Sequence, residues 1–190
     1  MIDQALQLVR DRLNDHLRTH FSVPEDLVSL SPLTDAEGKL AQAARNRLVI
    51  FLTNIAHDAV PRSRRDGIAG QLSQAPPLHM DVYFMVASGH DADLYGEGLK
   101  LISAALMFFQ SKPVFTPLTT PEMPLGLSQL TVEVSNLKTE EIAQVWANLG
   151  GRYTPSIMFK MRSILIDAGA ITSVVPLITA PSQRTEPESV

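Results

Sequence analysis

The sequence predicts an α+β fold in which about three helices pack against a mixed, mostly antiparallel sheet. Three segments repeat apolar residues every three or four positions, as amphipathic helices do, and several others alternate or are apolar throughout, as strands do. The 190 residues, 45% hydrophobic and 19% charged, are enough for one domain with a core. We expect that domain to span residues 1–170, followed by a C-terminal arm and disordered tail at 171–190.

In the first half of the chain, apolar periodicity and prolines predict one helix, two strands and a long loop. Residues 2–20 carry apolar side chains at helical spacing and predict the first helix. A short strand follows at 28–30 and stops near Pro32. Residues 46–55 are apolar on both alternate sets, which predicts a central strand covered on both faces. Residues 57–77 have no clean period and predict a long excursion between strands.

The second half continues with strands and helices in alternation. The expected order is a strand at 78–88, a helix at 98–110, a proline-rich loop at 111–126 with any strand confined to an edge, a half-buried strand within 127–137, a third helix ending at Gly150, and a long strand at 156–167.

Four details of this half are specific enough to test. The second helix is expected to carry Leu99 at the same apolar spacing as Ile102. In the third helix, Asn136 or Thr139 is the expected cap, and Trp146 packs inward together with Leu149. In the last strand, alternation places Phe159 and Met161 on one face and Ile164 on the other.

Histidine and aspartate residues offer the only set that invites enzyme chemistry. They are His57 and Asp58, His79 and Asp81, and His90, Asp91 and Asp93. A metal site needs ligands that converge, and nothing in this spacing imposes convergence. His57-Asp58 and His90-Asp91 fall in predicted turns, whereas His79 and Asp81 share one face of a strand and could orient each other as a base and its partner. No serine elbow, zinc motif or phosphate loop accompanies them.

Net charge and cysteine content narrow the function further. The formal charge of −4 gives no basic surplus for nucleic acid, and without cysteine there is no disulfide framework or zinc-thiolate site. No uninterrupted apolar stretch is long enough to span a membrane. The densest charge cluster is Arg62, Arg64 and Arg65, which is either a solvated loop or a docking loop for an acidic protein surface.

Three segments carry a family resemblance over about residues 1–170. They are FLTNI at 51–55, PPLHMDVYFMV at 76–86, and LKTEEIAQVWANLG through YTPSIMFKMRSILID at 137–167. This pattern resembles the tail-terminator or cap family of extracellular contractile injection systems, the antifeeding-prophage and Photorhabdus-virulence-cassette type, whose N-terminal domain was formerly a domain of unknown function. The resemblance implies a phage tail-terminator-like fold.

The same resemblance implies a structural role without catalysis or cofactors. The protein would cap the distal end of the inner tube and contractile sheath as a ring, expected to be a hexamer, so its partners would be its own copies and the tube and sheath proteins. Assembly would take place in the cytoplasm, in a particle that is then released or membrane-associated. The alternatives are a metal-dependent hydrolase or secreted effector that uses the His/Asp set, and a head-tail connector component.

The C-terminal arm, AGAITSVVPLITA at 168–180, is apolar but interrupted by a proline. Its apolar residues include Ile171, Val174, Val175 and Leu177. Pro176 prevents a fully paired central strand, and an exposed apolar edge is unfavourable in water. We expect the arm either to add to the sheet edge of an adjacent subunit or to fold back onto its own core.

Overall fold

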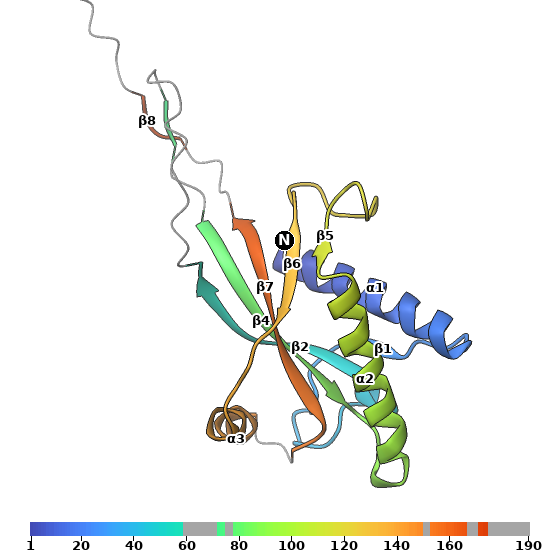
Figure 1. Ribbon diagram of the computed structural model, residues 1–190. Helices are drawn as coiled ribbons and strands as arrows, with labels where there is room; N and C mark the ends of the chain where they lie inside the picture. Colours follow the sequence, from blue (N-terminus) through green and yellow to red (C-terminus); the bar gives the residue numbers. More distant parts are fainter. Residues whose placement is uncertain (59–71, 75–77, 150–152, 167–170, 175–190) are drawn as a thin grey trace, which may run out of the picture. The chain divides into compact units, whose positions relative to one another are not determined.

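A computed structural model describes residues 1–58, 72–74, 78–149, 153–166 and 171–174 (Figure 1). The chain divides into two units. The larger comprises Met1–Ala59 and Leu78–Ile166, and the smaller comprises Val60–Pro77 and Asp167–Val190.

The larger unit is built on one six-stranded sheet. Its spatial order is β1 (Val28–Leu30), β2 (Leu48–His57), β4 (Leu78–Ser88), β7 (Ser156–Ile166), β6 (Leu130–Val134) and β5 (Val114–Phe115). Strand β1 pairs parallel with β2, and every other neighbouring pair in this sheet is antiparallel. The predicted mixed, mostly antiparallel sheet is therefore confirmed, and the proline-rich loop contributes only the edge strand β5.

Three helices cover the two faces of this sheet. Helices α1 (Ile2–Phe21) and α2 (Tyr95–Ser111) lie on one face, whereas α3 (Thr139–Asn148) lies on the other (Figure 1). Two short 3-10 helices, η1 (Gln42–Ala44) and η2 (Ala92–Leu94), complete the described helical elements. We call these surfaces the α1/α2 face and the α3 face.

The larger of two apolar cores lies between the sheet and the α1/α2 face. Phe159 is fully buried at its centre, with its ring 5.5 Å from that of Phe84 and 4.6 Å from that of Phe109. Pairs of aromatic rings at such distances add stabilisation beyond the area they bury. This core therefore joins α2 to the two central strands, β4 and β7.

Asn14 connects α1 to the edge strand β1. Its side-chain oxygen accepts hydrogen bonds from the backbone N–H groups of Leu27 (2.8 Å) and Val28 (3.1 Å), and its amide donates to Asp26 (2.8 Å). The side chain is buried, at 3% exposure. It thus satisfies backbone donors at the start of β1 that would otherwise be buried without a partner.

A second, smaller core lies on the α3 face. Trp146 is 3% exposed there and packs with Phe51, Met85 and Met158, which confirms its predicted core position. The cap of α3 is neither Asn136 nor Thr139: Lys138 precedes the helix, and its backbone N–H donates to Glu141 at 2.7 Å. Leu149 is 36% exposed, so the prediction that it packs inward is wrong.

Two further predictions are corrected by local geometry. Helix α2 begins at Tyr95 instead of residue 98. Leu99 is 41% exposed, because the stripe of α2 that packs on the sheet runs through Gly98, Ile102 and Phe109. Ile164 belongs to the same core as Phe159 and Met161, not to the opposite face. The β4–β7 register shifts between Met80 and Val82, and an extra residue at such a bulge reverses the alternation that follows.

The predicted double coverage of residues 46–55 holds for only part of β2. Leu48 to Phe51 are buried, but Leu52 is 42% and Ile55 40% exposed. Strand β1 pairs only with Leu48, Val49 and Ile50, so the rest of β2 has no described neighbour on that side. We call residues Leu48–Phe51 the closed half of β2 and Leu52–His57 its open half.

The smaller unit contains an antiparallel ribbon. Strand β3 (Leu72–Gln74) pairs with β8 (Ile171–Val174), with Leu72 opposite Val174. A strand inside the predicted excursion was not expected. Ile171 and Val174 of the predicted arm therefore have a partner strand in the same chain, whereas Val175 and Leu177 lie outside the described residues.

Candidate functional site

The His/Asp residues fall at opposite ends of β4. His57 ends β2 opposite Met80, and the Asp58 N–H donates to the backbone oxygen of His79 at 2.9 Å, so these residues gather near the start of β4. His57 thus lies in a strand and not in the predicted turn. His90, Asp91 and Asp93 follow the other end of β4. Within the described residues, no three His, Cys, Asp or Glu side chains are placed to hold a metal ion together.

Ser88 and His90 form a contact that resembles a nucleophile and its base. The Ser88 hydroxyl lies 3.0 Å from His90 Nδ1. Burial lowers the pKa of His90 below its usual value, although Glu97 and Asp91 oppose that shift. Ser88 is only 2% exposed, and a Cβ on Gly98 would lie 2.3 Å from its hydroxyl oxygen. The hydroxyl is therefore packed against α2, an arrangement that favours a structural hydrogen bond.

Charged side chains form a row across β4, β7 and β6 on the α3 face. Lys160 Nζ lies 3.8 Å from Asp81 and 3.2 Å from Glu133, and Arg162 lies 3.5 Å from Glu133. The same ammonium is 5.9 Å from the centroid of the Tyr83 ring. Two cations thus balance two carboxylates on neighbouring strands, an arrangement that matches cross-strand ion pairing.

Asp81 is the member of this row that sequence reasoning singled out. It is 6% exposed, and its Oδ1 atom has no hydrogen-bond partner among the described residues. His79 lies on the same strand, and the Lys160 ammonium lies 3.8 Å from the Asp81 carboxylate. The sequence left His79 and Asp81 either as a base with its partner or, as we favoured, as the polar face of a strand, and the ion pair between Asp81 and Lys160 agrees with the strand-face interpretation.

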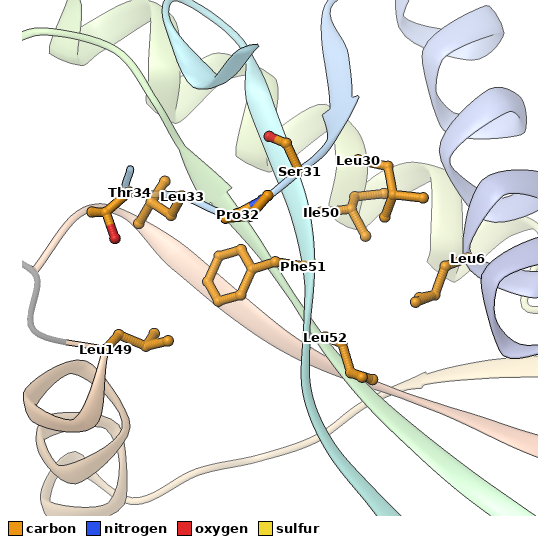
Figure 2. A pocket seen from close by; sticks show the side chains of 10 residues that line it. All are labelled: Leu6, Leu30, Ser31, Pro32, Leu33, Thr34, Ile50, Phe51, Leu52 and Leu149. Atoms are coloured by element: carbon orange, nitrogen blue, oxygen red, sulfur yellow. The ribbon is translucent and has the colours of Figure 1, made fainter. Parts of the chain in front are cut away.

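An apolar pocket lies along the edge of β2. It has a volume of about 450 Å³ and is lined by residues from α1, β1, the loop after β1, β2 and the end of α3. Figure 2 shows β2 passing between two groups of side chains, with Leu6, Leu30 and Ile50 on one side and Leu33, Phe51 and Leu149 on the other. No charged side chain lines it. We call this pocket the edge groove.

Sequence reasoning missed the edge groove because its lining is contributed by four separate elements and the loop after β1. One signal was present: the segment predicted for β1 is three residues long, whereas the predicted neighbouring strand spans ten. Unequal neighbours leave part of the longer strand unpaired.

The predicted partner-binding residues are only partly described. Arg62, Arg64 and Arg65 lie outside the described residues, as do Val175 and Leu177. For Ile171 and Val174 the structure gives the backbone pairing with β3. No helix among the described residues is long and apolar enough to cross a bilayer.

Comparison with known proteins places this architecture in context. The sequence model of the family described as the Pvc16 N-terminal domain matches residues 4–180. No curated protein matches the sequence.

Two solved structures share the fold. One is the sheath/tube terminator, in the extended state, of an extracellular contractile injection system named PVC, with a TM-score of 0.58, 15% identity and 100% of this chain covered. The other is the tube-terminating cap of the anti-feeding prophage, with a TM-score of 0.57, 16% identity and 95% covered. The match spans 64% and 61% of those longer chains.

Proposed function

The chain belongs to the Pvc16 N-terminal domain family, and from this premise we propose that it is a structural cap that terminates tube and sheath assembly in a contractile injection particle. The observation that carries the proposal is the extent of the structural match. The terminator of one such particle and the cap of another share the fold over 95% or more of this chain.

Termination requires a surface that ends polymerisation, and it does not require catalysis. Tube and sheath grow through head-to-tail contacts that do not close on themselves, so growth stops when a subunit offers the matching surface on one side only. A closed ring of identical subunits meets that requirement, and we propose a hexamer. The protein would then contact both tube and sheath subunits and use no cofactor.

Non-catalytic function is consistent with how the polar groups are used. The charged row is internally paired, and the Ser88 hydroxyl is packed beneath α2. In an enzyme, charged groups and a hydroxyl of this kind would be exposed to substrate. Here they contribute to packing and to ion pairs within the fold. We accordingly propose that the protein has no enzymatic activity.

Two sets of residues are proposed as partner contacts. Arg62, Arg64 and Arg65 would meet an acidic surface of a tube or sheath subunit, since complementary charge favours docking and fixes its register. The segment that contains Ile171, Val174, Val175 and Leu177 would contribute to contacts between neighbouring subunits.

Reconstitution tests the capping role directly. Tube and sheath subunits of the particle are assembled with and without the protein, and the products are imaged by negative-stain electron microscopy. We expect particles of narrow length distribution with extra ring-shaped density at one end only when the protein is present. Unchanged lengths and bare ends in its presence would reject the proposal.

Substitution of the three clustered arginines tests whether they contribute to capping. Replacing Arg62, Arg64 and Arg65 with Ala should reduce capping, and raised salt should reduce capping by the parent protein in the same direction. Arg45→Ala serves as the control, because it removes one exposed cation elsewhere. Equal capping by the triple variant at low and high salt would remove these arginines from the interface.

A further inference from the structure

Another pocket, of about 390 Å³, lies at the Ser88 end of β4, and we call it the end pocket. Its lining comes from the loop after β1 (within residues 33–40), the segment after β4 (88–92) and the residues just before β7 (153–154). Two backbone hydrogen bonds join these segments: the Ser88 N–H donates to Pro155 at 2.9 Å, and the Asn46 N–H donates to Gly89 at 3.0 Å. Ligand pockets span about 300–1,000 Å³, so this volume suits a side chain or a small molecule.

The walls of the end pocket are apolar and aromatic. Leu33, at 7% exposure, belongs to the core on the α3 face, and Leu40 packs against that core. The Tyr153 ring meets the Trp146 ring edge-on at 5.7 Å between centroids, yet Tyr153 is 63% exposed. Contact with a buried tryptophan thus positions a ring that remains accessible. Such walls suit a cation on an alkyl stem, because cations bind over aromatic rings and alkyl stems cover apolar surface.

Among the described residues that line the end pocket, one carries a charge at neutral pH. Asp91 is exposed and precedes η2 without capping it, and within the described part of the chain its carboxylate has no hydrogen bond or ion pair. Burial lowers the pKa of His90, so its imidazole is neutral near pH 7 and does not repel a cation. Lys39 is adjacent in sequence to lining residues but does not itself line the pocket. The described lining is therefore net negative.

A hydroxyl without a partner adds a hydrogen-bonding requirement. Thr154 lines the end pocket, and its Oγ1 atom is buried with no hydrogen-bond partner among the described residues. A buried polar atom without a partner costs free energy, and a bound donor removes that cost. The Ser88 hydroxyl, by contrast, already contacts His90 at 3.0 Å. The Asp91 carboxylate and the Thr154 hydroxyl can both accept hydrogen bonds from a ligand.

These features together select a guanidinium group as the ligand. An anion would meet the Asp91 carboxylate with no cation in the described lining, and a purely apolar group would leave Thr154 without a donor. A guanidinium carries five donors in a planar fork, stacks on aromatic rings and is more weakly hydrated than an ammonium. The described lining also offers no cation for the α-carboxylate of free arginine. An arginine within a polypeptide therefore fits better than the free amino acid.

We propose that the end pocket binds the side chain of an arginine presented by a partner protein. The Asp91 carboxylate accepts the guanidinium N–H groups, the Tyr153 ring stacks on the guanidinium, and Leu33 and Leu40 cover the alkyl stem. This inference does not rest on the capping function, and its test uses the isolated protein. It assigns a basic partner to this end of the sheet, whereas the arginine cluster was proposed to meet an acidic one.

Nuclear magnetic resonance titration of the isotope-labelled intact protein tests the proposal. The probe is the peptide acetyl-Gly-Gly-Arg-Gly-Gly-amide, and the backbone amide signals of residues 89–92 and 153–154 are followed. We expect saturable shifts there, with a millimolar affinity that falls at least fivefold in Asp91→Asn and at least threefold in Tyr153→Leu and in Thr154→Val. Asp93→Asn is the matched control, because it removes another exposed carboxylate outside the lining, and it should bind as the parent does.

Altered probes separate guanidinium recognition from general attraction. Citrulline in place of the arginine keeps the shape without the charge, and lysine keeps the charge without the planar fork, so both peptides should bind at least fivefold more weakly. Circular dichroism melts verify that each variant is folded. Absence of saturable shifts, equal binding of the citrulline or lysine peptide, or equal binding by Asp91→Asn would overturn the proposal. Tighter binding of free arginine than of the peptide would also overturn it, by identifying a site for the amino acid.

Discussion

The two halves of β2 differ in composition and in surroundings. The closed half is entirely apolar, whereas the open half also contains Thr53, Asn54 and His57. Ile50 in the closed half is fully buried between β1 and β4, whereas Ile55 in the open half is 40% exposed and, within the described part of the chain, pairs with β4 alone. The register with β4 shifts between Leu52 and Asn54, where one half gives way to the other. Burial along β2 therefore follows both the strands beside it and the change in its own composition.

The largest effect is expected from Ile50→Ala in the closed half. The change leaves a cavity under α1 and should lower the free energy of unfolding by about 2–5 kcal/mol. Urea denaturation followed by circular dichroism measures it. A loss below about 1 kcal/mol would mean that the closed half is less tightly packed than its burial indicates.

Asn14→Ala should have the next largest effect, because Asn14 holds β1, the strand that pairs with the closed half of β2. The substitution leaves the N–H groups of Leu27 and Val28 without their acceptor, at an expected cost of about 1–3 kcal/mol. Amide hydrogen exchange should rise at β1 more than at β7. Uniform exchange across both strands would contradict the local role of Asn14.

A smaller, pH-dependent effect is expected from His90, which follows the end of β4 that pairs with the closed half. Burial lowers the pKa of His90 in the folded protein, so the unfolded chain binds the proton at higher pH. Stability contributed by neutral His90 is thus present above about pH 6.5 and declines as pH falls towards the folded pKa.

His90→Gln tests this sign. Unfolding free energies at pH 7.5 and 5.5 should differ less in the variant than in the parent. Burial likewise lowers the pKa of His16, so His16→Gln is the matched control and should remove a separate part of the slope. A parent protein that becomes more stable on acidification would contradict both assignments.

The smallest effect is expected from Ile55→Ala in the open half. Its side chain is 40% exposed, so truncation should change the unfolding free energy by less than about 1 kcal/mol. Ile50→Ala measured under identical conditions is the comparison, because both variants remove the same atoms from an isoleucine side chain. Similar losses in the two variants would show that the open half is covered in solution.

Most helices and strands of the six-stranded unit were readable from the sequence because local periodicity or prolines encode them, whereas β3 was not predicted. Helix α1, the edge position of β5 and the buried Trp146 were all predicted correctly. The errors arose where a distant contact outweighs the local pattern. A register shift against β4 moved Ile164 to the core face, and packing of α2 on the sheet leaves Leu99 outside its buried stripe.

The candidate site was less predictable than the fold. The sequence identified Asp81 as a polar residue on a strand. It did not identify Lys160 as its ion-pair partner, because Lys160 lies on another strand. Asn14 looked like an ordinary helical residue, although its side-chain oxygen accepts a hydrogen bond from the backbone N–H of Leu27, just before β1. The edge groove depends on which strands become neighbours and on where one of them stops, and neither is a local property of the sequence.

The strand order has a consequence for synthesis on the ribosome. The central strand β4 ends at Ser88, yet its partner β7 begins only at Ser156, after α2, β5, β6 and α3. At translation rates of about 5–20 residues per second, the nascent β2–β4 hairpin must wait several seconds with a second apolar edge uncovered. We therefore expect chaperones to bind this intermediate during synthesis.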